Sequence, residues 1–267
     1  MNKLFLSAAI FAVSAFGQNV FAQGNLSPQQ VQHNSIQVVR ISGLETQSSM
    51  IIYSPSGDKR MRKMEIVSKL YNGGDLEKKL IRFLDPADVK GTGFLSFDYL
   101  KKDDDKWIYM PALRKTRRIV SSENAKSFMG SEFSYADMSV PSVEDYNYKF
   151  LQEETINGHA CYVLEVIPKD KRIANENGFS KKISYIDKKT FVLWKAVYYN
   201  LAGEKEKEMT VSSIEEVDTE NHKYRFREMT MVNLKNKRKS VLNNNQFKFS
   251  PSISDGYFTT RTLEQGK

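Results

Sequence analysis

Residues 48–84, SSMIIYSPSGDKRMRKMEIVSKLYNGGDLEKKLIRFL, decide the fold class of this chain. Three runs rich in Ile, Val, Met and aromatic residues, at 48–53, 59–69 and 76–84, are separated by SPSGD (54–58) and NGGD (72–75). Such runs are typical of β-strands, and clusters of Gly, Pro, Asn, Asp and Ser are typical of tight turns. Strands joined by short turns pair antiparallel, so this stretch predicts consecutive hairpins.

The same strand pattern continues to the end of the chain. Further strands are expected at residues 94–100, 106–110, 114–120, 146–154, 160–168, 181–187, 193–200, 209–217, 224–234 and 241–249. A helix is expected before them, from Gln29 to about Ile41, because Ser27 and Pro28 form a suitable helix start. Residues 121–138 break the pattern and predict a helix plus a loop. About 11 to 13 strands after one helix exclude an alternating βαβ fold and predict one mainly β (α+β) domain.

A strongly curved antiparallel sheet can fill its inner side with its own side chains or enclose a cavity. Charged residues on many expected strands, such as Glu65, indicate one solvated face. The other face carries large soft side chains, because Trp107 and Tyr109 share one side of their strand and Met229 and Met231 share one side of theirs. Whether that side is filled or hollow is therefore the functional question.

The first residues are typical of an export signal. A Lys near the start precedes an apolar run at residues 4–16, and a small-residue cleavage pattern ends at Ala22. We expect a cleaved signal peptide over residues 1–22 and a single domain over residues 23–267. The apolar run is shorter than the ~20 residues that a membrane-spanning helix needs. The absence of Cys at the cleavage point argues against a lipid anchor on the protein itself.

Charge and cysteine content restrict the partners and the chemistry. The chain has 40 Lys and Arg against 32 Asp and Glu, a formal net charge of +8. This excess favours anionic lipid headgroups or acidic protein surfaces, and an exported protein is not expected to bind nucleic acid. Cys161 is the only cysteine, so no intramolecular disulfide forms. Its flanks, ACYVL (160–164), predict a buried core thiol rather than a reactive one.

The sequence offers little catalytic chemistry. His33, His159 and His222 are the only histidines, and no two of them are spaced to share one face. The chain contains no nucleophile elbow, zinc-protease, Walker or dinucleotide-binding motif. Three consecutive carboxylates at residues 103–105 lack the spacing of a calcium loop, so a solvated hairpin tip is expected there. We expect no enzyme activity, no catalytic residue, no metal and no cofactor.

A basic run at residues 114–118, RKTRR, leaves two interpretations open. On a strand, Arg114 and Arg118 face one way and Arg117 faces the other. The run is either a solvated sheet edge that repels further strands, or a docking patch for anionic headgroups or an acidic partner.

Residues 127–138, SFMGSEFSYADM, are the strongest functional indication from composition alone. Aromatic and methionine side chains are concentrated there beside glycine and serine, and such surfaces adapt to ligands of variable shape. The alternative is an ordinary core plug beneath a loop.

Several of these segments carry a resemblance to a known family. The block WIYMPALRKTRRI (107–119), with SFMGS (127–131) and FSYxD (133–137), resembles the outer-membrane lipoprotein-sorting (LolA-like) proteins. The resemblance is strongest to the subgroup found beside exporters of the resistance-nodulation-division (RND) type. The segments DPADVKGTGFL (85–95) and GYFTTRTL (256–263) are similar to the same subgroup.

This resemblance implies an unclosed antiparallel β-barrel, a half-barrel of about 11 strands, with helices covering an apolar concave side. It also implies a periplasmic carrier that ferries lipids or lipoprotein acyl chains between the inner and outer membranes, with only transient membrane contact. The residues expected to bind the hydrophobic cargo are Phe97, Trp107, Tyr109, Phe128, Met129, Phe133 and Met138. The second hypothesis is a non-enzymatic accessory subunit without lipid cargo, which docks on an inner-membrane RND-type exporter through Arg114, Arg117 and Arg118.

Overall fold

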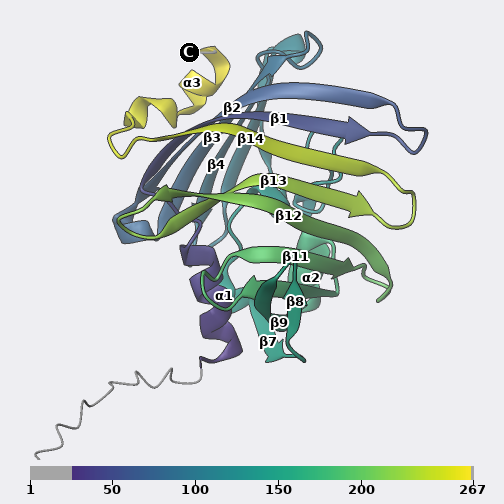
Figure 1. Ribbon diagram of the computed structural model, residues 1–267. Coiled ribbons are helices and arrows are strands. Elements are labelled where there is room, and N and C mark those ends of the chain that lie inside the picture. Colours follow the sequence, from purple (N-terminus) through teal and green to yellow (C-terminus); the bar gives the residue numbers. More distant parts are fainter. Residues whose placement is uncertain (1–25, 266–267) are drawn as a thin grey trace, which may run out of the picture.

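The computed structural model of the protein describes residues 26–265 (Figure 1). The expected signal peptide and its cleavage point lie outside these residues. Within residues 26–265, no helix has both the length and the apolar character needed to cross a membrane.

One antiparallel sheet runs through the described chain. Its strands are β1 (Gly43–Tyr53), β2 (Lys59–Tyr71), β3 (Leu76–Asp85), β4 (Gly93–Tyr99), β5 (Asp105–Met110), β6 (Lys115–Ile119), β7 (Tyr146–Phe150), β8 (Glu154–Ile156), β9 (His159–Pro168), β10 (Lys181–Asp187), β11 (Leu193–Tyr199), β12 (Lys205–Asp218), β13 (Lys223–Asn233) and β14 (Lys239–Phe249). The strand order is β6-β5-β4-β3-β2-β1-β14-β13-β12-β11-β10-β9-β7, and β8 also pairs with β9. Because β6 and β7 are the two ends of this order, the sheet is an unclosed half-barrel, as expected.

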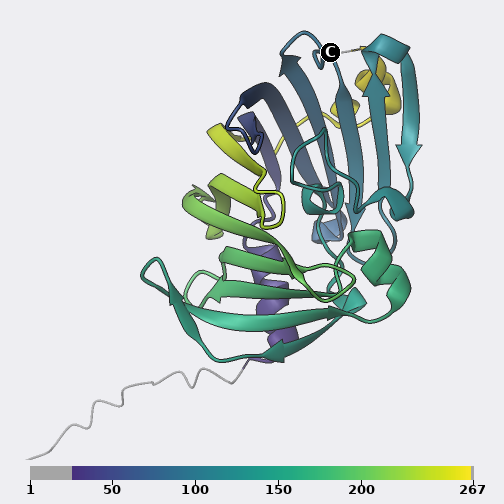
Figure 2. The same ribbon diagram turned by 90° about the vertical axis from the view of Figure 1, so that its right-hand side faces the viewer.

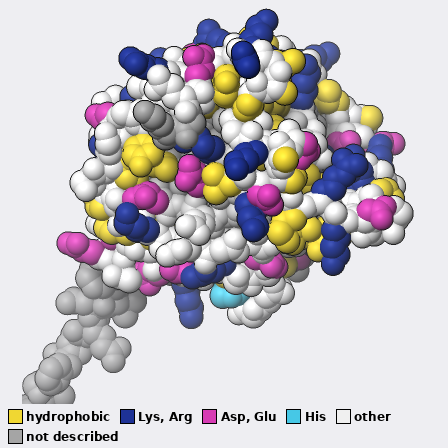
Figure 3. Space-filling view, turned by 90° about the horizontal axis from the view of Figure 1, so that it is seen from above, with side chains coloured by type: hydrophobic (Ala, Val, Ile, Leu, Met, Phe, Trp, Pro, Cys, Tyr) yellow, Lys and Arg dark blue, Asp and Glu magenta, His cyan; other side chains and the backbone are white. Residues whose placement is uncertain are grey.

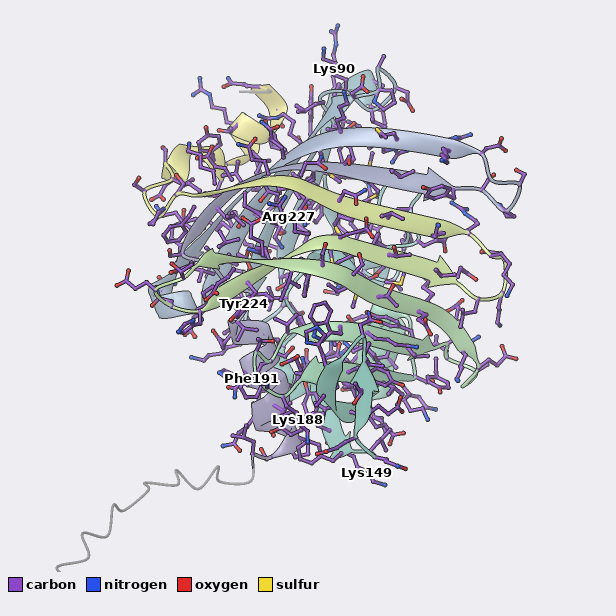
Figure 4. The ribbon with its side chains drawn as sticks, in the orientation of Figure 1. Lys90, Lys149, Lys188, Phe191, Tyr224 and Arg227 are labelled. Carbon is purple, nitrogen blue, oxygen red and sulfur yellow. The ribbon has the colours of Figure 1, made fainter. Side chains whose placement is uncertain are left out.

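The strands predicted from the sequence are all present, and β8 is one short strand more. Most neighbours are consecutive hairpin strands, whereas β1 pairs with β14 and so joins the first and last strands in the middle of the sheet. The curvature places Lys90, in the turn after β3, at the opposite end of the molecule from Lys149 on β7 (Figure 4).

The helix expected between residues 121 and 138 is wrong. This segment contains two short 3-10 turns, η3 (Ser121–Glu123) and η4 (Ala136–Met138), and irregular backbone between them. Its serine and aspartate side chains bind the backbone instead: Ser127 Oγ donates to the carbonyl of Ser131 at 2.6 Å, and Asp137 accepts from the amide of Ser134 at 2.7 Å. Such local bonds compete with helical hydrogen bonds.

Between residues 26 and 265, three α-helices flank the sheet, α1 (Pro28–Gln37), α2 (Lys171–Asn177) and α3 (Thr260–Gln265). The expected start of α1 is confirmed, because Ser27 and Gln30 form a reciprocal capping box with Pro28 in the first turn. The helix ends at Gln37, short of the expected Ile41. The amide of Tyr224, at the start of β13, donates to the carbonyl of Val38 at 2.8 Å and holds the end of α1 against the sheet (Figure 4).

The sheet buries apolar side chains on both faces. On the concave face, Ile81 and Phe94 belong to the main core. On the opposite face, Leu80 and Leu95 pack in a separate cluster with Leu263 of α3, which lies outside the curve (Figure 1). The chain alternates between these clusters with a period of two, as side chains of a strand do.

Candidate functional site

The concave side of the sheet encloses a cavity of about 540 Å³. Its walls come from the inner face of the strands, from α1 and the residues that follow it, and from the segment 121–145, around which the strands curve in Figure 2. The volume lies within the range of cavities that hold small ligands, about 300–1,000 Å³. Apolar side chains that line it include Ile36, Ile66, Met209, Phe226, Met229 and Met231. The expected shared face of Met229 and Met231 is thus part of the cavity wall.

We call residues 121–145 the covering segment. Glu132, near its middle, anchors it to the half of the sheet that contains β12 and β14. Its amide donates to Ser240 Oγ at 2.9 Å, and its carboxylate lies 2.9 Å from Arg238 Nε. The carbonyl of Glu132 accepts from Lys207 Nζ at 3.2 Å. On the other half of the sheet, Arg62 of β2 donates to the carbonyl of Met129. The segment therefore bridges β2 to β12 and β14 across the concave side.

A cluster of aromatic rings around Phe128 also fixes the covering segment. The ring of Phe128, fully buried, lies 5.4 Å from that of Phe94, 6.0 Å from that of Phe83 and 5.6 Å from that of Tyr135. Aromatic pairs at these separations stabilise packing beyond the area they bury. Phe128 thus holds the segment in the core next to the cavity.

Part of the cavity wall is charged, although many of the side chains that line the cavity are apolar. Arg40 and Glu77 are each only 2% exposed, and both line the cavity with Lys79 and Arg225. Arg225 Nη2 lies 3.5 Å from Glu77 Oε1, and Lys79 Nζ lies 3.2 Å from Asp98 Oδ2. Burial opposes ionisation of Glu77, but Lys79, Arg225 and Arg40 together hold its pKa below the ordinary value. Glu77 is therefore ionised at neutral pH although it is buried.

A second polar group lies on the wall formed by β10 and β11. Burial lowers the pKa of Lys182, and the Asp137 carboxylate opposes this effect. Asp137 accepts from the hydroxyl of Tyr198 at 3.3 Å, and burial raises the pKa of Tyr198 well above its ordinary value, so the phenol stays protonated. Asp137 therefore joins the covering segment to the strands.

The residues predicted to bind hydrophobic cargo are divided between three places. Phe133 and Met138 line the cavity. Phe128 and Met129 lie in the main core beside it. Phe97, Trp107 and Tyr109 lie together on the opposite face, in the cluster that α3 and the residues before it cover.

The three aromatic residues on the opposite face are therefore placed differently from the expectation, and they do not line this cavity. Trp107 and Tyr109 do share one side of β5, as predicted. The alternation of side chains along a strand shows which residues share a face, but it does not show which face curves inward. Here the C-terminal segment packs on the outer face, where these aromatic residues lie.

The basic run lies at an edge of the sheet, as one of its two interpretations requires. Arg114 precedes β6 in a left-handed conformation (φ 47°) and is exposed, as is Lys115. Arg117 Nη1 lies 2.8 Å from Glu123 Oε2, and Arg118 pairs with Asp105, so two of the charges have internal partners. On the face of the molecule seen in Figure 3, Lys and Arg side chains are spread out, with Asp and Glu between them.

The buried charges of the cavity wall were not predicted from the sequence. Glu77 and Lys79 alternate on β3 with the same phase as Ile81 and Phe83, which are core residues of the concave face. Charged residues in phase with a buried apolar stripe are the signal that was available, because all four side chains must face the same way. Arg40, just after α1, had no such signal.

Comparison with known proteins places this fold in a wider group. A family model described as an uncharacterized protein family matches residues 75–265. No curated protein sequence matches the chain. A crystal structure described as an outer membrane lipoprotein-sorting protein domain, from Vibrio parahaemolyticus, is 28% identical with a TM-score of 0.81, over 89% of this chain and 98% of that one.

Two further crystal structures agree in fold. A DUF1329 family protein from Desulfovibrio piger is 29% identical with a TM-score of 0.80, over 88% of this chain and 97% of that one. A LolA superfamily protein from Nitrosomonas europaea is 18% identical with a TM-score of 0.68, over 89% of this chain and 99% of that one. The half-barrel is thus the LolA-like fold that the sequence resemblance implied.

Proposed function

The chain belongs to the protein family whose model matches residues 75–265, and it has the LolA-like fold; from that premise we propose that it is a non-enzymatic periplasmic carrier of lipids or lipoprotein acyl chains. It takes up an acyl chain in the concave cavity and ferries it between the inner and outer membranes. The observation that carries the proposal is the cavity of about 540 Å³, lined by Ile, Phe and Met side chains, beneath the covering segment.

The wall of the cavity suits alkyl chains of variable shape. Met209, Met229, Met231 and Met138 contribute flexible thioether side chains from two strands and the covering segment. Unbranched methionine side chains adapt to irregular apolar ligands. Each buried methylene of a cargo chain contributes about 0.8 kcal/mol, so about ten methylenes give on the order of 8 kcal/mol before ordering costs. Because the same methylenes are also buried in a membrane, this gain offsets the cost of leaving the bilayer rather than exceeding it.

The experiment is to identify what the protein carries. Protein purified from its own host without detergent is analysed by native mass spectrometry and by organic extraction, and the delipidated protein is titrated with a fluorescent fatty acid. A bound acyl compound and saturable uptake are expected. Protein that is consistently empty and that also fails to take up the fluorescent fatty acid would remove the carrier proposal.

A second candidate function rests on the basic edge of the sheet. Arg114 and Lys115 are exposed at β6, next to an unpaired strand edge, and would suit an acidic surface on an inner-membrane RND-type exporter. Reversing the charges of Arg114 and Lys115 tests this docking function and leaves the ion pairs of Arg117 and Arg118 in place. Loss of exporter pull-down with intact lipid loading would favour docking, and unchanged pull-down would remove it.

A further inference from the structure

Arg40 is a buried cation with unused hydrogen-bonding capacity in the cavity wall. Its Nη2 donates to the carbonyl of Gly74 at 2.5 Å. Its Nε and Nη1 atoms are buried and have no hydrogen-bond partner among residues 26–265. A guanidinium that is 2% exposed and only partly bonded is costly, because burial removes its water without replacing every bond.

The neighbouring charges do not complete the bonding of Arg40. The charge of Glu77 acts on Arg40, but its Oε1 atom lies 3.5 Å from Arg225 and has no hydrogen-bond partner in the described part of the chain. Lys79 itself is bonded to Asp98 and to the carbonyl of Met138. The Nε atom of Arg225 also has no hydrogen-bond partner in the described part of the chain. Two guanidinium groups thus present free N–H donors at one place.

The cavity as a whole carries an excess of positive charge. Its charged lining side chains are the cations Arg40, Lys79, Lys182, Lys207 and Arg225 and the anions Glu77, Asp137 and Glu206. An apolar ligand gains nothing from this excess, whereas a ligand with one anionic end would pair with it. The apolar part of the wall, which includes Met209, Met229 and Met231, suits the tail of the same molecule.

We propose that Arg40, assisted by Arg225, binds the anionic headgroup of the cargo, so that the cavity selects acyl amphiphiles ending in a carboxylate or phosphate. This inference rests on the proposed carrier function and names its cargo class. Guanidinium groups bind both oxyanions through paired N–H donors, and such charge-assisted bonds are about twice as strong as neutral ones. The tail then extends along Met229 and Met231 into the apolar part of the cavity.

The first test needs no variant. Delipidated protein is titrated with a long-chain fatty acid, the fatty alcohol of the same chain length, the corresponding alkyl phosphate and inorganic phosphate alone. The acid and the alkyl phosphate are expected to bind at least about tenfold more tightly than the alcohol, because the alcohol lacks the charge. Inorganic phosphate alone is expected to bind weakly, since it has no tail to bury.

Substitutions then locate the headgroup. Arg40→Gln and Arg225→Gln are expected to reduce the preference for acid over alcohol by about tenfold while alcohol binding changes little. Arg82→Gln is the matched control, because Arg82 is similarly buried but lies on the outer face, where it donates to the carbonyl of Thr262. Lys182→Met removes a different cavity cation and is expected to leave the preference unchanged.

The outcomes separate this inference from the proposed function. Equal binding of acid and alcohol to the unsubstituted protein would overturn the headgroup site and leave the carrier function standing. A preference lost in Lys182→Met but kept in Arg40→Gln would also overturn it, because the headgroup would then lie at the other wall. Failure of all the long-chain ligands to bind would overturn both, and tight binding of inorganic phosphate alone would indicate a phosphate site instead of a lipid one.

Discussion

The ammonium of Lys79 donates to the carbonyl of Met138 at 2.8 Å, which joins the floor of the cavity to the segment that covers it. The same ammonium lies 3.2 Å from the fully buried carboxylate of Asp98. Burial disfavours the charged form of Lys79, but Asp98 and Glu77 hold its pKa above the ordinary value. Lys79 is therefore the residue through which the sheet and its cover are electrostatically coupled.

Lys79→Met should lower the free energy of unfolding by about 3–5 kcal/mol, because it leaves Asp98 as an unpaired buried charge. Urea denaturation measures the change. Lys78→Met, one residue away on the outer face, is the matched control and should cost less than about 1 kcal/mol. Adding Asp98→Asn to Lys79→Met should restore part of the loss. Equal effects of Lys78→Met and Lys79→Met would contradict the prediction.

Met229→Trp should block the cavity, because the larger side chain occupies space that the cargo chain needs. Exclusion of even two methylenes should weaken binding of a fluorescent fatty acid by about tenfold or more. Met61→Trp introduces the same change at a site that is 49% exposed, outside the cavity, and should leave uptake unchanged. Undiminished uptake by Met229→Trp would mean that the cargo binds elsewhere.

Asp104 should make the protein less stable as the pH rises from about 4 to about 6. Burial and the nearby Asp98 carboxylate raise the pKa of Asp104 from 3.8 to about 6, against the attraction of Lys106. Between these values the folded state keeps a proton that the unfolded chain has lost, so stability falls by roughly 3 kcal/mol across the window. The contribution of Asp104 to stability is constant again above its pKa in the folded state.

The measurement for Asp104 is the free energy of unfolding against pH for the unsubstituted protein and for Asp104→Asn. The difference between the two free energies should change within this window. A flat difference would contradict the raised pKa of Asp104.

Gly43→Ala should destabilise the protein by about 1–3 kcal/mol through overpacking. An added Cβ would lie 2.2 Å from the carbonyl oxygen of Ser250, a backbone atom that cannot rotate away. Gly256→Ala is the control, because its Cβ would lie 3.4 Å from Ser254 Oγ, an ordinary contact. Thermal unfolding of the two variants checks this, and equal midpoints would contradict it.

Cys161 should resist thiol reagents until the protein unfolds. The residue is fully buried, and burial with the nearby Asp187 carboxylate raises the thiol pKa to about 11. The thiolate, which is the reactive form, is then scarce at neutral pH. Labelling with an aromatic disulfide should be slow in buffer and rapid in denaturant. Rapid labelling of the native protein would show that the sheet opens near β9.

Local sequence patterns were sufficient to predict the strands and the antiparallel pairing of most consecutive strands, but not the pairing of β1 with β14. Turn residues such as those at 54–58 separate the strands, and short connections leave consecutive strands no other pairing. The core position of Cys161 could be predicted for the same reason, because its flanks are those of a buried strand. The segment 121–138 was harder, because its serine and aspartate side chains could bond either to water or to its own backbone.

The sequence by itself determined which side chains share a face, because successive side chains of a strand point to opposite faces whatever surrounds the strand. Only the tertiary structure decided which face is hollow, because residues 253–263, including part of α3, pack on the outer face beside Trp107 and Tyr109. It alone also decided that Arg40 lines the cavity. Burial of a charge depends on contacts with distant parts of the chain, here the carbonyl of Gly74 and the Glu77–Arg225 pair, and these contacts exist only after the sheet has curved.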